Sequence, residues 1–213
     1  GAVMTKEQLE EVARVVKKYD LLVAADEIYS ELTYGTKHTA FASLPDMWER
    51  TITINGFSKS YAMTGWRLGY IAAPEALAGE MLKVHQYNVT CAATMGQIAG
   101  IEAMKNGDDD IENMRLEYDK RRKFLLKSLR DMGYECFEPK GAFYVFPSIK
   151  KTGLSSEEFA NKLLWEAKVA VVPGSSFGEN GKGFVRLAYA TSMENLQEAV
   201  KRIQNFTDKI TAQ

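Results

Sequence analysis

The chain has 213 residues, of which 46% are hydrophobic and 26% charged, an ordinary composition for a globular protein. Its 27 lysines and arginines against 28 acids give a net charge of -1, which excludes the strongly basic surface that nucleic acids or anionic membranes require. We expect neither a membrane-spanning helix nor a signal peptide. The two cysteines, Cys91 and Cys136, match no metal-binding or redox spacing, so we expect free thiols and a cytoplasmic protein.

Helical and strand patterns alternate in the first half of the chain. Thr5 and Gln8 have capping-box spacing, and the apolar residues that follow recur at helical spacing, which predicts a helix over residues 6–18. The apolar run 21–25 predicts a strand of a parallel sheet, covered on both faces and ended by the carboxylate of Asp26. Residues 51–54 and 68–73 predict two further strands, and residues 75–106 read as helical. This alternation is typical of α/β folds.

A long amphipathic helix is predicted to begin at the acidic cluster 108–110, where carboxylates suit the helix dipole, and to stop near Gly133. Beyond it, strand patterns at residues 134–137, 143–146, 169–172 and 184–189 surround a helix capped by Ser155 and Glu158. A last helix follows Ser192. We therefore place a domain boundary near residue 115. Residues 1–114 belong to an α/β domain with a mostly parallel sheet, and residues 115–213 form a small α+β domain.

A lysine follows the second predicted strand, in a turn of small polar residues. The segment NGFSKS at residues 55–60 places Lys59 just past a strand end, where open α/β sheets bind their ligands, and Arg67 follows shortly after. A lysine that attacks a carbonyl must first lose its proton, because the ammonium form is not a nucleophile. Lysines in loops are usually only solvated, so this segment alone leaves both interpretations open.

Four segments read together resemble the class I and II aminotransferases of fold type I, the group that includes aspartate and aromatic aminotransferases. They are KSYAMTGWRLGY at residues 59–70, DEIY at 26–29, VPGSSFG at 172–178 and VRLAY at 185–189. The first is very close to the group's cofactor-attachment signature, and all four occur in the family's order. The resemblance implies an enzyme dependent on pyridoxal 5'-phosphate (PLP), with residues 1–114 as part of its large cofactor-binding domain and residues 115–213 as its small C-terminal domain.

The resemblance assigns a role to each residue of the candidate site. Lys59 would hold PLP through its amine and move a proton between substrate and cofactor. Asp26 would pair with the pyridine nitrogen, and Tyr29 would donate its phenol to the ring oxygen. Arg67, with help from the Ser58 hydroxyl, would bind the phosphate. Without the resemblance, Asp26 reads as a helix cap and Tyr29 as a packing residue.

Arg186 lies in the apolar run 184–189, where an arginine is costly unless it is paired. The resemblance implies that it binds the α-carboxylate of an amino-acid substrate through two hydrogen bonds. An intramolecular salt bridge is the alternative.

The implied activity is the transfer of an amino group from an L-amino acid, with aspartate as the first guess, to a 2-oxo acid such as 2-oxoglutarate. The resemblance also implies a homodimer. The same lysine, aspartate and arginine serve lyases and synthases of this fold. Outside the enzymes, a non-catalytic regulatory or assembly domain is the alternative.

The resemblance also places segments upstream that this chain lacks. The chain begins at Gly1 without an initiator methionine, close to the position after the family's NPxxPTG stretch. The family's cofactor-contacting asparagine, phosphate-binding turn and ring-stacking aromatic residue all lie before that point. We therefore expect a longer parent to transaminate and these 213 residues alone to be inactive. An incomplete sheet should also leave apolar strand edges uncovered, which favours association with another copy or rearrangement of residues 1 to about 90.

Other conspicuous residues are interpreted as structural. The tryptophans are expected in the core or at an interface, and they are Trp48, Trp66 and Trp165. His38 and His85 lack a second histidine or an acidic cluster at metal spacing, so we expect no metal site. The basic run 120–123 is expected to form a solvated face of the long helix.

Overall fold

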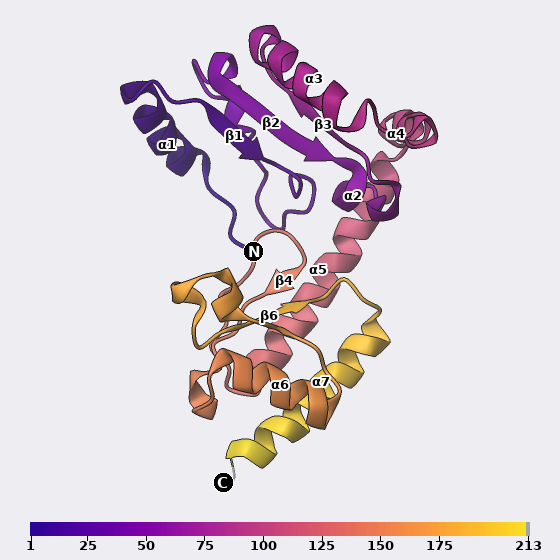
Figure 1. Cartoon of the computed structure of the whole chain (residues 1–213). Helices are drawn as coiled ribbons and strands as arrows, with labels where there is room; N and C mark the ends of the chain where they lie inside the picture. The colour runs from indigo at the N-terminus through magenta and orange to yellow at the C-terminus, as the bar shows by residue number, and fades with distance from the viewer. Residues whose placement is uncertain (212–213) are drawn as a thin grey trace. The chain divides into compact units, whose positions relative to one another are not determined.

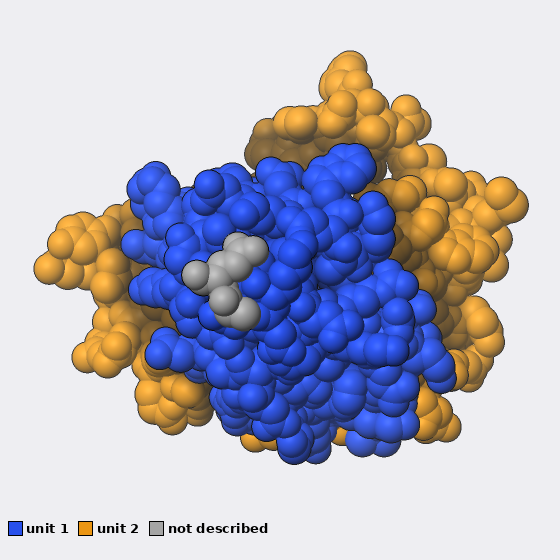
Figure 2. Space-filling model, turned by 90° about the horizontal axis from the view of Figure 1, so that it is seen from below, with its two compact units in different colours: residues 1–2, 116–213 blue, residues 3–115 orange. Residues whose placement is uncertain are grey.

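The computed structural model describes residues 1–211 (Figure 1). The chain forms two compact units, Val3–Arg115 and Leu116–Gln213, the second of which also includes Gly1–Ala2 (Figure 2). Within the part of the chain that is described, no helix is long and apolar enough to cross a bilayer. The assignment of residues 1–114 and 115–213 to a cofactor-binding domain and a small domain remains a proposal.

The unit Val3–Arg115 is built on a three-stranded sheet. Its strands β1 (Val23–Asp26), β2 (Thr51–Gly56) and β3 (Gly69–Ala72) lie in the order β1-β2-β3. Strands β1 and β2 are parallel, whereas β3 returns antiparallel to β2 with Gly56 opposite Gly69. A Cβ atom on Gly56 would lie 3.0 Å from the Cα atom of Gly69, so this close pairing requires glycine.

Helix α1 (Lys6–Lys18) packs on β1 through a small apolar core. Its N-terminus has the predicted capping box, in which the Thr5 hydroxyl accepts from the backbone N–H of Gln8. The core joins buried residues of α1 to the 3-10 helix η1 (Phe41–Ser43) and to the segment that leads from it to a second 3-10 helix, η2 (Trp48–Arg50). Its buried members are Ala13, Val16, Phe41, Leu44 and Met47.

Strand β1 is covered on one face only. Val23 and Ala25 pack against the core around α1, whereas Ala24 and Asp26 are exposed among residues 1–211. Leu21 and Leu22 precede the strand and are 45% and 62% exposed. The prediction that residues 21–25 are covered on both faces is therefore wrong. A continuous apolar run is typical of a strand covered on both faces, but within residues 1–211 nothing covers the face that carries Ala24.

The predicted helical stretch 75–106 consists of two helices, α3 (Glu75–Val89) and α4 (Thr94–Asn106). Thr90 has a left-handed φ of 63° and breaks the helix between them. Eight large apolar side chains of the two helices are exposed: Leu82, Val84, Tyr87, Val89, Met95, Ile98, Ile101 and Met104. These side chains lie on helices, so the expectation of uncovered apolar strand edges stays a prediction.

In the unit that contains residues 116–211, helices pack on one face of a small antiparallel sheet. The strands β4 (Tyr144–Val145), β5 (Val172–Pro173) and β6 (Val185–Ala188) lie in the order β4-β6-β5. The helices are α5 (Asp108–Asp131), α6 (Ser156–Ala167) and α7 (Met193–Thr211), and α6 has the predicted Ser155 and Glu158 cap. Leu129 of α5, Phe159 of α6 and Ile203 of α7 line one small gap together with Val185 and Leu187 of β6.

The direction of side chains on β6 follows from this packing. Val185 and Leu187 are buried toward the helices. Successive strand residues point to opposite faces, so Arg186 and Ala188 point away from the helical core. The predicted strand 134–137 is reduced to a single bridge between Cys136 and Pro147.

The tryptophans do not lie in the core, because Trp48, Trp66 and Trp165 are 48%, 52% and 71% exposed, and their place at an interface stays a prediction. One structural interpretation is wrong. The run 120–123 is not uniformly solvated, because Arg122 is only 5% exposed. Arg122 lies three residues before Leu125 and therefore falls on the buried stripe of α5.

Candidate active site

Lys59 is held at the end of β2 by a one-turn helix, α2 (Phe57–Ser60). Phe57 and Ser60 are three residues apart, so they share a face of this turn, and both are buried. Ser58 and Lys59 are left half-buried on the other side. The backbone N–H of Phe57 donates to the carbonyl of Leu68 at 3.2 Å, which fixes the turn to the start of β3.

The structure brings Lys59 together with Tyr29. The amine of Lys59 lies 5.9 Å from the centre of the Tyr29 ring. The two residues meet because β1 and β2 are parallel and both end at the same edge of the sheet, with Asp26 beside Ile54. Farther along, the side-chain N–H of Asn55 donates to the Ser30 hydroxyl at 3.3 Å and ties the two strand ends together.

Asp26 is the last residue of β1 and is exposed. One carboxylate oxygen accepts from the backbone N–H of Ile28 at 3.2 Å and forms an Asx turn. No helix begins at residues 27–31, so the alternative interpretation of Asp26 as a helix cap is wrong. Among residues 1–211, the other oxygen has no hydrogen-bond partner and the carboxylate has no ion pair. One oxygen is thus available to a ligand.

Arg67 is connected to Ser58 through Thr64. The Thr64 hydroxyl donates to the carbonyl of Ser58 at 2.8 Å, and the Arg67 guanidinium donates to the carbonyl of Thr64 at 2.8 Å. Thr64 belongs to the 3-10 helix η3 (Thr64–Trp66), after which Arg67 adopts a left-handed backbone, with φ 52° and ψ 48°. Such a conformation is costly for a residue with a side chain and is found mostly where a site fixes it. Arg67 is exposed and pairs with no carboxylate in the described part of the chain.

Arg186 belongs to the other compact unit, on the outer face of β6. Its guanidinium carbon lies 4.4 Å from the centre of the Tyr144 ring and 4.6 Å from that of Phe177. Within residues 1–211 no carboxylate lies at ion-pair distance from it, so the salt-bridge alternative is not realised there.

The sequence pattern missed a buried acid beside Asp26. Glu27 is 8% exposed, and its Oε1 accepts from the backbone N–H of Phe41 at 2.9 Å. Its Oε2 lies 2.9 Å from Nε2 of His38. Glu27 thereby holds the loop that follows Tyr29, and residues of this loop line an open hollow of about 980 Å3 with the first turns of α5. These contacts could not be predicted, because Glu27 is separated from His38 and Phe41 by intervals that match no sequence pattern.

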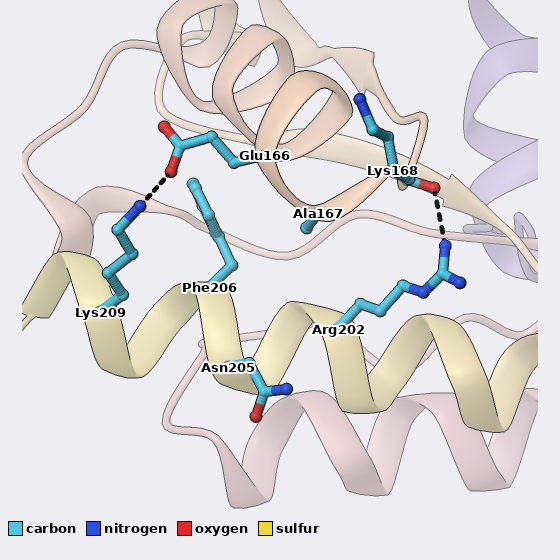
Figure 3. Close-up of a pocket in the computed structure, with 7 residues that line it drawn as sticks. All are labelled: Glu166, Ala167, Lys168, Arg202, Asn205, Phe206 and Lys209. Atoms are coloured by element: carbon cyan, nitrogen blue, oxygen red, sulfur yellow. Dashed lines mark hydrogen bonds and ion pairs between the residues drawn. The ribbon is translucent and has the colours of Figure 1, made fainter.

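A separate hollow of about 390 Å3 lies between the end of α6 and α7 (Figure 3). Most of its charged groups are already paired, since Lys209 pairs with Glu166 at 2.7 Å and Arg202 pairs with Glu198 at 2.8 Å. Arg202 also donates to the carbonyl of Lys168, which caps the C-terminus of α6. We therefore interpret the residues that line this hollow as structural, because their contacts hold α6 and α7 together.

The fold and site define an α/β protein with a lysine at the carboxyl edge of two parallel strands, accompanied by a phenol, a carboxylate and an arginine. A family model described as aminotransferase class I and II matches residues 1–203. The chain belongs to this family, as the resemblance implied.

Named relatives agree with the family assignment. The chain is 51% identical over 207 residues to an aspartate aminotransferase of Pyrococcus abyssi. It is 50% identical over 207 residues to aromatic-amino-acid aminotransferase 2 of Thermococcus litoralis. Each match covers 96% of this chain and 53% of the relative, so the chain spans about half the length of the curated relatives it matches.

A solved structure confirms the fold class. An aromatic aminotransferase from Pyrococcus horikoshii OT3 superposes with a TM-score of 0.94 at 49% identity. The match covers 98% of this chain and 57% of that one.

Proposed function

We propose that this chain supplies the lysine, aspartate, tyrosine and arginines of a PLP-dependent aminotransferase that moves an amino group from an L-amino acid to a 2-oxo acid such as 2-oxoglutarate. The observation that carries the proposal is the half-buried Lys59, 5.9 Å from the Tyr29 ring at the ends of parallel strands. Two relatives at 50% and 51% identity are named for aromatic amino acids and aspartate. Aspartate is the donor we propose first.

The residues present fit the cofactor chemically. Lys59 offers an amine to an aldehyde, and Asp26 offers a carboxylate oxygen to a protonated ring nitrogen. Tyr29 offers a phenol to the ring oxygen, while Arg67 and Ser58 offer donors to a phosphate. When bound, PLP supplies an electron-accepting ring that makes the α-hydrogen of an amino acid acidic.

Each residue then has a defined task. The Lys59 amine would take a proton from the α-carbon of the substrate and pass it to the cofactor, acting as a positioned general base and then as a general acid. The Asp26 carboxylate would pair with the ring nitrogen and keep it protonated. Arg67 holds the anionic end of the cofactor in place. Arg186 binds the α-carboxylate, which orients the α-hydrogen for removal.

We further propose that the enzyme is a cytoplasmic homodimer. The exposed apolar residues of α3 and α4 support association with a second copy, because monomers rarely expose large contiguous apolar surface. The cysteines, Cys91 and Cys136, are both free, as suits a reducing compartment.

The deciding experiment locates the cofactor. A longer protein that contains these residues is incubated with PLP, reduced with borohydride and digested. Mass spectrometry is expected to find the adduct on Lys59. Lys59→Ala should lower turnover of aspartate with 2-oxoglutarate by at least about 10²–10⁴-fold, the contribution of a general base. Lys83→Ala changes an exposed lysine that pairs with Glu80, and it should leave turnover unchanged. An adduct on another lysine would refute the assignment.

A second arm tests the 213-residue chain itself. We propose that it neither retains PLP through gel filtration nor turns over amino acids, because its relatives carry about as many residues again. Turnover by this chain, lost in Lys59→Ala, would show that the inactivity proposal is wrong while leaving the lysine assignment intact.

A further inference from the structure

Two aromatic rings contact the guanidinium of Arg186. Tyr144 lies opposite Ala188 in the pairing of β4 with β6, so it shares the outer face of the sheet with Arg186. Phe177 closes the 3-10 helix η5 (Gly174–Phe177). The ring centres lie 4.4 Å and 4.6 Å from the guanidinium carbon, well within cation–π range.

Each ring is supported by further rings. Phe177 meets Phe146 edge-on at 5.9 Å, and Phe146 stacks on Phe184 at 5.5 Å with an interplanar angle of 11°. On the other side, the Tyr144 ring lies 4.8 Å from that of Phe143. The orientation of the guanidinium is thus fixed by side chains that are themselves packed.

The loop that carries Phe177 is also held tightly. Gly174 donates its backbone N–H to the carbonyl of Phe184 at 2.8 Å. A Cβ atom on Gly174 would lie 2.1 Å from the carbonyl oxygen of Gly181, so the two backbones touch. The Ser175 hydroxyl donates to the carboxylate of Glu157 on α6. Phe177 therefore projects from a braced turn, although its side chain is half exposed.

The rings hold the cation without neutralising it. No carboxylate within residues 1–211 pairs with Arg186, whereas Arg122 of the same unit is held by Asp119 and Glu138. Aromatic faces attract a guanidinium through its faces and leave its edge, which carries the N–H donors, unoccupied.

We propose that Tyr144 and Phe177 are positioning residues that fix the Arg186 guanidinium so that it binds a planar carboxylate edge-on, in its own plane, and disfavours tetrahedral anions. The proposal rests on the role of Arg186 in the proposed function. A carboxylate places two oxygens against two parallel N–H groups. A sulfonate or phosphonate carries a third oxygen out of that plane, toward the ring faces.

The test uses the 213-residue chain without cofactor. The side-chain Nε–Hε signal of Arg186 is followed by NMR during titration with acetate and, separately, with methanesulfonate, which has the same charge. Acetate is expected to bind more tightly. Phe177→Leu and Tyr144→Leu should each weaken acetate binding roughly two- to fivefold, the factor that corresponds to an exposed cation–π contact. They should also reduce the preference for acetate over methanesulfonate.

Matched variants separate positioning from general damage. Phe177→Tyr keeps an aromatic face and should retain both the affinity and the preference. Phe137→Leu removes a 65% exposed ring elsewhere in the unit and should change neither. Unchanged acetate affinity and preference in Phe177→Leu and Tyr144→Leu would overturn the proposal.

Separate results would contradict the assigned role of Arg186 itself. If the Arg186 signal does not move at the highest acetate concentration, or if Arg186→Gln binds acetate as tightly as the unaltered chain, Arg186 is not a carboxylate receptor in this chain. That result would overturn the positioning proposal too, whereas the borohydride assignment of Lys59 would still stand.

Discussion

Arg122 is a buried cation whose partners hold the start of the C-terminal unit together. It donates to Asp119 at 2.8 Å, to Glu138 at 3.1 Å and to the carbonyl of Pro139 at 3.0 Å. Burial opposes the charge of Asp119, but hydrogen bonds from Lys123 and Arg122 outweigh it and lower the pKa of this carboxyl. The network satisfies a charge that would otherwise be too costly to bury.

Arg122→Met should lower the free energy of unfolding by about 1.5–3 kcal/mol, the range for a lost hydrogen bond to a charged group. The methionine fills the same stripe of α5 but leaves the Pro139 carbonyl without its donor. Urea denaturation followed by circular dichroism measures the loss. Lys120→Met is the matched control, because the Lys120 side chain is 68% exposed and should matter little. Equal effects of the two variants would contradict this account.

Tyr134 makes the free energy of unfolding depend on pH in the alkaline range. Burial raises its pKa above the ordinary value of 10.0, and a hydrogen bond of 2.6 Å to Thr207 opposes this only in part. The folded state therefore retains the phenol proton at pH values where the unfolded chain loses it. Because the folded pKa is raised, this contribution to stability is complete below the ordinary value and is lost as pH rises through the folded pKa.

Tyr134→Phe should therefore be less stable than the unaltered chain at neutral pH but lose less stability between neutral and alkaline pH. Urea midpoints across that range measure both effects. Burial also raises the pKa of Tyr61 and Tyr118, so the variant should reduce the alkaline loss without removing it. Tyr87→Phe, at a ring 95% exposed, should follow the unaltered chain. Parallel curves for Tyr134→Phe and the unaltered chain would show that Tyr134 is not responsible.

Site residues were predictable where a family motif or a strand end marked them. Lys59 and Tyr29 follow two adjacent parallel strands, so their meeting is a consequence of topology. Tyr144 and Phe177 were not predictable as partners of Arg186, since that contact depends on strand register and on the fold of a loop. Sequence spacing carries neither kind of information.

At the scale of elements, the loop over residues 174–181 depends on two glycines in contact. A Cβ atom on Gly181 would lie 2.0 Å from the carbonyl oxygen of Gly174, a backbone atom that has no room to move freely. Gly178 between them has φ 106°, a conformation that side chains rarely adopt. The loop is therefore specified by backbone sterics as much as by hydrogen bonds.

Gly174→Ala should destabilise the chain by about 1–3 kcal/mol, as overpacking does, and shift the Arg186 Nε–Hε signal because Phe177 moves with the loop. Thermal denaturation and NMR report the two effects. Gly79→Ala is the control, since Gly79 lies within α3 with open space at its Cβ position. That variant should be neutral or stabilising by up to about 1 kcal/mol. A Gly174→Ala chain with unaltered stability and an unmoved Arg186 signal would contradict the prediction.

Helices with a local start signal were the elements that sequence predicted best. Thr5 with Gln8 and Ser155 with Glu158 form capping boxes as predicted, because a cap is a contact between residues three apart. The direction of a strand was harder to predict from the sequence. Residues 68–73 read as a strand, but nothing in their composition indicated that β3 would return antiparallel to β2.

At the scale of the whole molecule, the exposed apolar residues of α3 and α4 predict association. Sedimentation velocity should show a concentration-dependent shift from monomer to a larger species. Ile98→Glu adds a charge where the side chain is 63% exposed and should favour the monomer. Asn88→Glu adds the same charge at an exposed polar position of α3 and should have a smaller effect. A monomer at every concentration, with α3 and α4 protected from hydrogen exchange, would instead indicate rearrangement.

Asp26 and Glu27 are adjacent acids with divided tasks. The first is exposed and keeps a free oxygen, whereas the second is buried and holds the backbone of Phe41. If each carboxylate were neutralised in turn, both variants should lose activity, but for different reasons. A Glu27→Gln enzyme that fails should regain function at low temperature or with a stabilising additive, and an Asp26→Asn enzyme should not. Inactivity at position 27 is therefore poor evidence for chemistry there.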